Sequence, residues 1–443
     1  MKICAYVQTS YAKATYSNEN FNVRQWVGLS VIIDSLKRQG YEVEYAGKTT
    51  VHQYDLVLLS LTSDCDWWNY IAERVTWQKG GYKVIVGGAG LLNIRPFLEF
   101  CDIFVWGRGE NLIGEIVRAE ENGNRFINES VAYADTFNAD TDIYYIKQDK
   151  CYPHNVVLSN GKTFIERTQG CPHKCLFCGY SWQRKYQGEG EFEAGSGLWA
   201  GEDVNKERAI IDMYKAQEYD LKHLRITAID GMSQRLRFMV NKKITRDMLQ
   251  ELYRQMARHD KPHQLKIYNI VGYPSETAED WEEFVEDIRI VDSQIRPQKQ
   301  WSIVLHNTPF RPMPATPAAC WPASYDNYRG KIAKVLGRGN YKGNIFYQGN
   351  AFWAVESMGT DSLSTVILSM ICHRGTESDS DNVRKISCSS KFWGASSIIK
   401  LRTLEKYFDV AKLFKALNYE ELPTRYIRSY AKLEKFWENS KLS

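Results

Sequence analysis

The 443-residue sequence lacks the features that mark membrane proteins and disulfide-rich secreted proteins. No apolar run approaches the roughly 18 residues that a membrane-spanning helix needs. The ten cysteines are too sparse for a disulfide scaffold in a chain of this length. An apolar strand pattern, Ile3–Val7, begins almost at the first residue, so no N-terminal signal segment is expected. The sequence therefore predicts a cytoplasmic protein with no membrane partner.

The sequence also has no large excess of positive or negative charge. The 57 basic and 53 acidic residues leave a net charge of +4, which is too small to indicate a nucleic-acid binder by itself. The excess is uneven, because residues 396–443 contain ten Lys or Arg and six Asp or Glu, a net charge of +4 for this segment alone. A solvated helix face is the first interpretation of this segment, and a phosphate-binding surface is the alternative.

Three of the cysteines stand apart from the others by their spacing. Cys171, Cys175 and Cys178 form a C-x3-C-x2-C pattern, and a short strand pattern, 162–167, precedes them. Thiolates are soft ligands that suit iron–sulfur clusters. Three ligands can hold three irons of a cubane and leave the fourth open, as in metal sites that perform chemistry. A zinc site that includes His173, or a disulfide, is the weaker alternative by spacing.

This spacing, with the aromatic Phe177 before the third cysteine, resembles that of the radical S-adenosylmethionine superfamily. The resemblance implies a [4Fe-4S] cluster whose open iron binds the amino and carboxylate groups of S-adenosylmethionine. Reductive cleavage of this cofactor would give a 5′-deoxyadenosyl radical. The resemblance also implies an electron donor such as flavodoxin or ferredoxin.

Residues 1–118 alternate strand and helix patterns, which predicts an α/β domain with a doubly wound, Rossmann-like parallel sheet. The expected strands are Ile3–Val7, Leu56–Leu61, Val84–Val86 and Ile103–Trp106, and the expected helices are Val23–Arg38 and Trp67–Trp77. Ligands of such sheets bind at the carboxyl ends of the strands.

The order of these elements resembles the cobalamin (B12)-binding domain that precedes the barrel in one branch of the superfamily. The residues that carry this resemblance are Asp55, Ser60, Gly87, Gly88, Pro96, Asp102, Gly107, Arg108, Gly109 and Glu110. The Asp-x-His-x-x-Gly motif, whose histidine would ligate cobalt, is absent, and His52 is the only histidine in this domain. The sequence therefore leaves open whether cobalamin is bound.

Residues 119–161 are expected to form a linker and a hairpin that turns at Asn160-Gly161, the strongest short hairpin dipeptide. After the cysteines comes a segment rich in Gly and Glu, 187–202. The superfamily usually carries a Gly-Gly-Glu-like segment that binds the methionine amino group. Glu202 is the candidate for that role, and a flexible loop is the alternative.

A predicted strand, His223–Ile229, leads into a segment with Asp230, Ser233 and Arg235, followed by Asn241-Lys242. This segment resembles the superfamily's element with an acid, a serine and an arginine at the fourth barrel strand. The resemblance implies that Asp230 and Ser233 face S-adenosylmethionine, and Arg235 belongs to the same candidate set. A turn and helix cap is the alternative for Asp230.

The next predicted strand, Leu265–Val271, leads into Gly272, Pro274, Glu276 and Thr277. These four residues resemble the Gly-x-Pro-x-Glu-Thr element that contacts the adenine side of the cofactor. They also precede the expected helix Ala278–Val291, where a carboxylate and a hydroxyl stabilise free amides.

A further strand, Trp301–His306, precedes the segment 307–317, which resembles the closing element of the barrel. Residues 179–223 are too few for three βα units, which need roughly 75 residues. One interpretation is a partial, shortened (β/α) barrel over residues 162–320. The alternative is that the strand 224–229 is the second strand of the barrel, and the motifs favour the shortened barrel.

Residues 321–443 are predicted to form a helical C-terminal domain. The expected helices are Ala351–His373, Ser396–Leu417 and Glu421–Lys441, with a polar loop from Arg374 to Asn382. The aromatic residues of this region are expected in the core or at an interface, and with the lysines they could also stack on bases. They include Trp353, Trp393, Tyr407, Tyr426, Tyr430 and Trp437.

The reaction follows from whether cobalamin binds. With cobalamin, methyl transfer to an unactivated carbon is expected, and without it a radical isomerase or rearrangement, for instance of a modified nucleobase. A nucleic-acid-associated iron–sulfur protein without radical chemistry is a second alternative. The sequence assigns no catalytic residue, and the substrate can be a small molecule, a peptide or a nucleic acid.

Replacing Cys171, Cys175 and Cys178 with Ala should abolish the brown absorption near roughly 400 nm that thiolate-to-iron charge transfer gives. The measurement is the absorption spectrum with the iron and sulfide content after anaerobic reconstitution. A triple variant that keeps the full iron and sulfide content would contradict this assignment.

Overall fold

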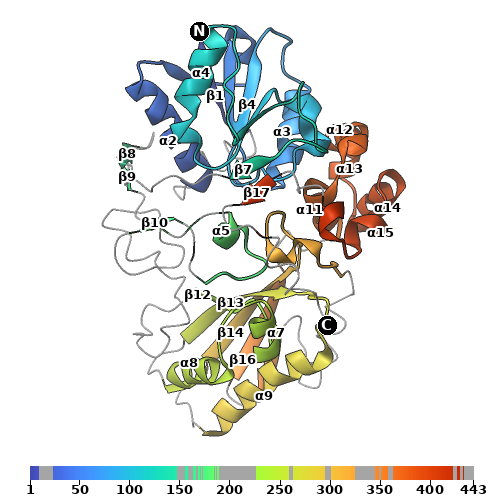
Figure 1. Ribbon diagram of the computed structural model, residues 1–443. Coiled ribbons are helices and arrows are strands. Elements are labelled where there is room, and N and C mark those ends of the chain that lie inside the picture. The colour runs from blue at the N-terminus through green and yellow to red at the C-terminus, as the bar shows by residue number, and fades with distance from the viewer. Residues whose placement is uncertain are drawn as a thin grey trace.

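In the computed structural model, the described residues form two large sheets, three two-stranded sheets and a group of helices (Figure 1). The described residues are 1–8, 23–146, 155–157, 163–165, 168–169, 171, 173–183, 185, 187–188, 226–258, 263–294, 301–324, 345–348, 351–357, 363–422, 427–429 and 433. The N-terminal sheet lies at the top of Figure 1 and the second sheet at the bottom.

The N-terminal sheet has the order β2-β1-β3-β4-β5-β6. Its strands are β1 (Ile3–Tyr6), β2 (Val43–Ala46), β3 (Leu56–Ser60), β4 (Lys83–Gly87), β5 (Ile103–Val105) and β6 (Val131–Tyr133). The first five are parallel in the flavodoxin-like order of doubly wound sheets, which confirms the expected class. β6 is antiparallel to β5 and lies within the expected linker, because its alternation is too short to stand out.

Alternate residues of these strands face opposite sides, as the strand period of two requires. On one side Ala5, Leu58 and Ile85 pack under α2 (Val23–Arg38) and α4 (Ile113–Glu121). On the other side the strands pack against α3 (Asp66–Arg74) and the 3-10 helix η2 (Arg95–Phe100). Short 3-10 turns η1 (Val51–Gln53) and η3 (Gly109–Asn111) complete this part.

The second sheet has the order β12-β13-β14-β16-β15. Its strands are β12 (Ile226–Ala228), β13 (His263–Val271), β14 (Trp301–Pro309), β15 (Ile345–Gln348) and β16 (Ala351–Ser357), and its helices are α7 (Gln234–Met239), α8 (Arg246–Arg258) and α9 (Ala278–Gln294). β12, β13, β14 and β16 are parallel, and β15 pairs antiparallel with β16. The strands expected before Asp230, before Gly272 and before the segment 307–317 are therefore confirmed.

The expected helix Ala351–His373 is wrong over its first seven residues, which form β16. Aromatic and β-branched residues in this stretch favour a strand, and β14 offers it a parallel partner. The sheet thus extends past residue 320. The helix itself, α11, spans Leu363–Arg374.

The C-terminal helices are α11, α12 (Ser380–Ser387), α13 (Ser390–Trp393), α14 (Ser397–Tyr407) and α15 (Val410–Phe414), and they lie beside α3 (Figure 1). The expected polar loop 374–382 is wrong, because a capping box of Thr376 and Asp379 begins η6 (Glu377–Asp379) and leads into α12. The expected helix Ser396–Leu417 is broken after Tyr407, and Asp409 caps the separate helix α15.

The expected helix Glu421–Lys441 is also wrong in its described part. The 3-10 turn η7 (Tyr419–Glu421) is followed by β17 (Ile427–Ser429), which pairs in parallel with β7 (Tyr144–Ile146). A partner strand far away in the sequence overrides the local helical pattern here. Tyr426, Tyr430 and Trp437 lie outside the described residues.

Short strands flank the cysteines. β8 (Asn155–Val157) and β9 (Thr163–Ile165) pair antiparallel, which confirms the hairpin, although its turn lies outside the described residues. β10 (Thr168–Gln169) pairs with β11 (Gln187–Gly188), and α5 (Gly179–Trp182) lies between them in the sequence. Residues 189–225 lie outside the described residues. Among the helices that the structure describes, none is long and apolar enough to cross a membrane.

The last turn of α11 is the junction between the N-terminal domain and the rest of the chain. Ser369 donates a hydrogen bond to the Asp64 carboxylate after β3, and His373 Nε2 lies 2.9 Å from Asp64 Oδ2. Burial raises the pKa of Asp64, but His373 together with Arg311 and Ser369 outweighs burial and holds this pKa below its usual value. Asp64 therefore stays a carboxylate at neutral pH.

Arg374, at the end of α11, connects this helix to other parts of the chain than Asp64. Its buried guanidinium donates to four backbone carbonyls, those of Leu413, Lys415, Ala319 and Trp321, at 2.7–2.8 Å. One side chain thus joins α15 to the segment that follows β14. Burial lowers the pKa of this guanidinium to about 10.

Arg374→Met should lower the free energy of unfolding by about 3 kcal/mol or more, because four buried carbonyls lose their donor. Arg384→Met is the control, since the exposed Arg384 forms its ion pair with Glu99 at the surface, which predicts a loss under about 1 kcal/mol. Denaturant unfolding of both variants measures the difference. Equal losses would show that Arg374 does not fasten the junction.

Candidate functional site

The cysteine loop, residues 171–178, has hydrogen bonds within itself and to the helix α5 that follows it. Cys178 N donates to Cys175 O at 3.1 Å, and Trp182 Nε1 donates to the same carbonyl at 2.8 Å. Cys175 is 8% exposed, while Cys171 and Cys178 are half-buried, and all three are free thiols. Burial raises the pKa of Cys175 to about 12, against the opposing effect of Lys242.

Two strand-end segments hold this loop from either side. Leu176 N donates to Val240 O after α7 at 2.9 Å, and Ala318 N, in the 3-10 turn η5 (Pro317–Cys320) that follows β14, donates to Leu176 O at 3.1 Å. The Phe177 ring packs 6.5 Å from that of Tyr273, after β13. The structure therefore brings the cysteine loop together with the segments that follow β12, β13 and β14.

Asp230 follows β12 in a left-handed conformation, with φ +49°, and forms an ion pair with Lys242. Both side chains are mostly buried, and Tyr273 Oη donates to Asp230 O at 3.0 Å. Burial lowers the pKa of Lys242, but Asp230 and Cys175 outweigh burial and raise it. A lysine cation and an aspartate therefore lie next to the cysteine loop, and the assignment of Asp230 to the cofactor stays a prediction.

Ser233 and Arg235 have structural contacts in this protein. Ser233 is 2% exposed, caps α7 by accepting from Leu236 N at 3.1 Å, and donates to Asp280 at the start of α9. Arg235 donates to the same carboxylate, at 2.6 Å, and to Ser275 O at 2.7 Å. These contacts tie α7 to α9, and the assignment of both residues to the cofactor stays a prediction.

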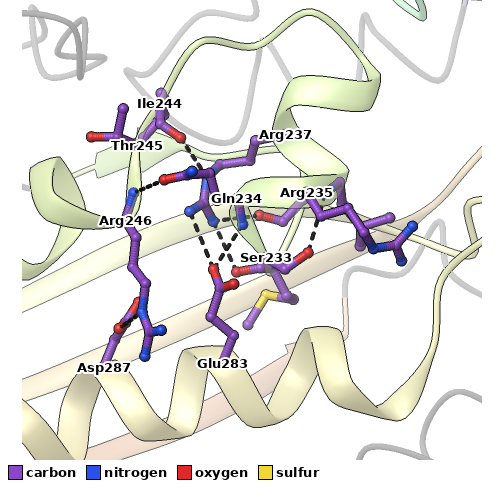
Figure 2. Close-up of polar contacts among 12 residues, drawn as sticks. Ser233, Gln234, Arg235, Arg237, Ile244, Thr245, Arg246, Glu283 and Asp287 are labelled. Carbon is purple, nitrogen blue, oxygen red and sulfur yellow. Dashed lines mark hydrogen bonds and ion pairs between the residues drawn. The ribbon is translucent and has the colours of Figure 1, made fainter.

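Arg237 is a residue of this site that the sequence reasoning did not assign. It is 0% exposed, and it donates to Gly231 O at 3.0 Å, Met232 O at 2.8 Å and Ile244 O at 2.9 Å. Figure 2 shows its guanidinium above Glu283, 3.7 Å from Nη2 to Oε1. Burial lowers the pKa of Arg237. The sequence shows an arginine four residues after Ser233, but only the fold shows that the side chain of this arginine is buried.

The turn after β13 is closed by Glu276. Its carboxylate accepts from Gly272 N and, at 2.7 Å, from Trp281 Nε1. Burial raises the pKa of Glu276, against these hydrogen bonds. Gly272 has φ +88°, which suits glycine, and Pro274 is half-buried in the turn. Thr277 N donates to Asp280 Oδ2 at 2.8 Å, so this turn also caps α9, as the sequence allowed.

The remaining candidate, Glu202, lies outside the described residues. Three free thiols on one loop fit the donor set of an iron–sulfur cluster. Within the residues that the structure describes, no three His, Cys, Asp or Glu side chains are arranged to hold a single metal ion. The ligands of a cubane need no such convergence, because each thiolate binds a different iron.

The carboxyl edge of the N-terminal sheet is where a cobalamin would bind. Leu61 N donates to Gly87 O at 2.8 Å, and Gly90 N donates to Leu61 O at 2.9 Å, so the loops after β3 and β4 touch. A Cβ atom at Gly88 would collide with the Leu61 backbone. His52 precedes β3 and so lies at the opposite edge. The loops after β3 and β4 are therefore in contact at this edge, and the loop after β1, residues 9–22, lies outside the described residues.

Comparisons with known proteins do not assign this chain to a family. No family model matches the sequence, and no curated protein matches it either. Among solved structures, the chain is similar to an apo, selenomethionine-labelled form of OxsB, described as a cobalamin-dependent S-adenosylmethionine radical enzyme, at 9% identity and a TM-score of 0.25. The match covers 90% of this chain and spans 57% of the OxsB chain. A TM-score this low does not establish a common fold.

Asp230→Ala should weaken S-adenosylmethionine binding by about 10-fold, because it leaves the Lys242 cation buried without its partner and disturbs the loop. Glu115→Gln is the control, since Glu115 pairs with Arg118 on the exposed face of α4. Equilibrium binding to the reconstituted protein gives both affinities. An unchanged affinity for Asp230→Ala would count against the placement of the cofactor at this strand end.

Proposed function

We propose that this protein is a radical S-adenosylmethionine enzyme that abstracts a hydrogen atom from a carbon of its substrate. One observation carries the proposal: Leu176 of the C-x3-C-x2-C loop is hydrogen-bonded to both Val240 and Ala318, in the segments that follow the carboxyl ends of β12 and β14. Active sites of parallel β/α architectures lie at this end of the strands. The cysteine spacing and the strand-end motifs thus support one site.

Cys171, Cys175 and Cys178 would hold the [4Fe-4S] cluster. When bound, this cluster would supply the electron for reductive cleavage of S-adenosylmethionine to a 5′-deoxyadenosyl radical. The protein's own groups hold the loop, keep Lys242 charged beside Asp230 and limit the access of water to Cys175. We assign Asp230, Ser233, Arg235 and the Gly272–Thr277 turn to the cofactor side, and Arg237 to the support of α7.

Methyl transfer and radical rearrangement or bond cleavage are both candidates for the reaction in this proposal. The loops after β3 and β4 are hydrogen-bonded to each other, and the loop after β1, residues 9–22, lies outside the described residues. Cobalt analysis of the purified protein decides between the two reactions, because stoichiometric cobalamin would make methyl transfer the first candidate.

The substrate and the electron donor stay open in this proposal. A one-electron carrier such as flavodoxin or ferredoxin fits the need for a reductant. A small molecule, a peptide and a nucleic acid remain as substrates, and the exposed basic residues of α14 are the reason to keep nucleic acid. An iron–sulfur protein without radical chemistry is the rival, because the cysteines alone do not imply cofactor cleavage.

Reduced, reconstituted protein should cleave S-adenosylmethionine to 5′-deoxyadenosine and methionine without substrate, and chromatography of the products measures this. The Cys171, Cys175 and Cys178 triple-Ala variant is the control, since it lacks the cluster ligands. A wild-type protein with a full cluster that forms no more 5′-deoxyadenosine than this variant would leave the non-radical rival.

A further inference from the structure

We infer that Asn241 is the positioning residue of the cysteine loop, and this inference rests on the proposed function. Its side-chain amide Nδ2 donates to His173 O at 3.1 Å and to Lys174 O at 2.9 Å. The two carbonyls belong to successive residues between Cys171 and Cys175. One neutral amide therefore fixes the backbone of the loop at its turn.

The turn depends on an unfavourable backbone conformation. Lys174 has φ +54°, in the left-handed region that disfavours residues with a side chain. Lys174 is one of the three residues that separate Cys171 from Cys175. Orienting the carbonyls on both sides of Lys174 restrains this conformation, and the contact of Lys174 Nζ with Ser181 O, at 2.5 Å, adds a second restraint.

Position 241 itself admits few residue types. Asn241 has φ +60°, which asparagine and glycine adopt most readily. Glycine would adopt this backbone conformation but has no side-chain amide. Glutamine has a side-chain amide but is unfavourable in this conformation, and aspartate has the shape of asparagine but no side-chain donor. Of these four residue types, asparagine alone combines a side-chain donor with this backbone conformation, which explains the residue by its two contacts and its backbone together.

Further contacts join the cysteine loop to the segment that follows α7. Leu176 N donates to Val240 O, next to the two bonds from Asn241, so residues 173–176 and 240–241 are joined by three hydrogen bonds. Lys242, the next residue, reaches Asp230. The segment after α7 thus fixes the loop through Asn241 and the acidic strand end through Lys242. Asn241 adds no charge beside the thiols, so its effect is one of geometry.

A double-mutant cycle tests this role. The variants are Asn241→Gly, Lys174→Gly and the pair together, since glycine needs no restraint to adopt the left-handed conformation that Lys174 has. Asn241→Gly should lose iron to a chelator about 10-fold faster than wild type, as removal of a supporting contact to a metal ligand commonly costs. In the Lys174→Gly background the same change should have an effect of about 2-fold or less.

A second measurement needs no cluster. Alkylation of Cys175 in the apo-protein by iodoacetamide should accelerate in Asn241→Gly and Asn241→Asp, because the loop opens, and again much less in the Lys174→Gly background. Asn382→Gly is the matched control, since Asn382 also donates a side-chain amide to a backbone carbonyl, Tyr407 O at 2.8 Å, away from the loop. This control should leave iron loss and alkylation unchanged, and circular dichroism checks that every variant is folded.

The outcomes separate the two proposals. Equal chelator and alkylation rates in wild type and Asn241→Gly, or an undiminished effect in the Lys174→Gly background, would overturn the role of Asn241. A wild-type protein that takes up a cluster but cleaves no S-adenosylmethionine would defeat the proposed function and leave this role standing. If wild type takes up no cluster, the alkylation rates still decide whether Asn241 holds the loop.

Discussion

The need to satisfy buried backbone carbonyls governs both the candidate site and the junction beneath the N-terminal domain. Arg237 donates to three carbonyls around the Asp230 turn, and Arg374 donates to four where α15 meets the segment after β14. In neither place is a carboxylate the main partner. Buried guanidinium groups can hold irregular chain in this way because a planar fork offers five donors at once. Loops that could otherwise not be buried are thereby fixed.

The candidate site is built from the same kind of contact on a smaller scale. The cysteine loop packs through the apolar side chains of Leu176 and Phe177, and backbone hydrogen bonds to Val240 and Ala318 and the amide of Asn241 also set its place. Glu276 and Ser233 serve the neighbouring turns by accepting backbone amides. Polar side chains near the thiols therefore divide into those that hold turns and those, such as Asp230 and Lys242, whose charge lies beside the loop.

Local signals explain which parts of this fold could be predicted. The strands before Asp230 and Gly272 and the helix after Thr277 follow from apolar runs and helix-start residues next to them. The residues of β16 favour a strand, but its partner β14 lies about fifty residues earlier in the sequence, so the local pattern did not separate this strand from the helix α11 that follows it. Arg237 and Ser233 were ambiguous for a related reason, since both a cofactor contact and an internal contact suit their types. The contacts of Asp64 with α11 span 305 residues, and no local pattern encodes them.

The shared core of α3 and the C-terminal helices has a consequence for synthesis of the chain. On one side of the N-terminal sheet, residues such as Trp68 and Phe97 belong to the same hydrophobic core as Met370, Ile386 and Phe392. When the N-terminal sheet has left the ribosome, this core lacks the part that α11–α13 supply. Exposed apolar surface of this kind favours aggregation of nascent chains. The N-terminal domain is thus expected to depend on chaperones until the C-terminal helices emerge, and to be a poor unit for expression by itself.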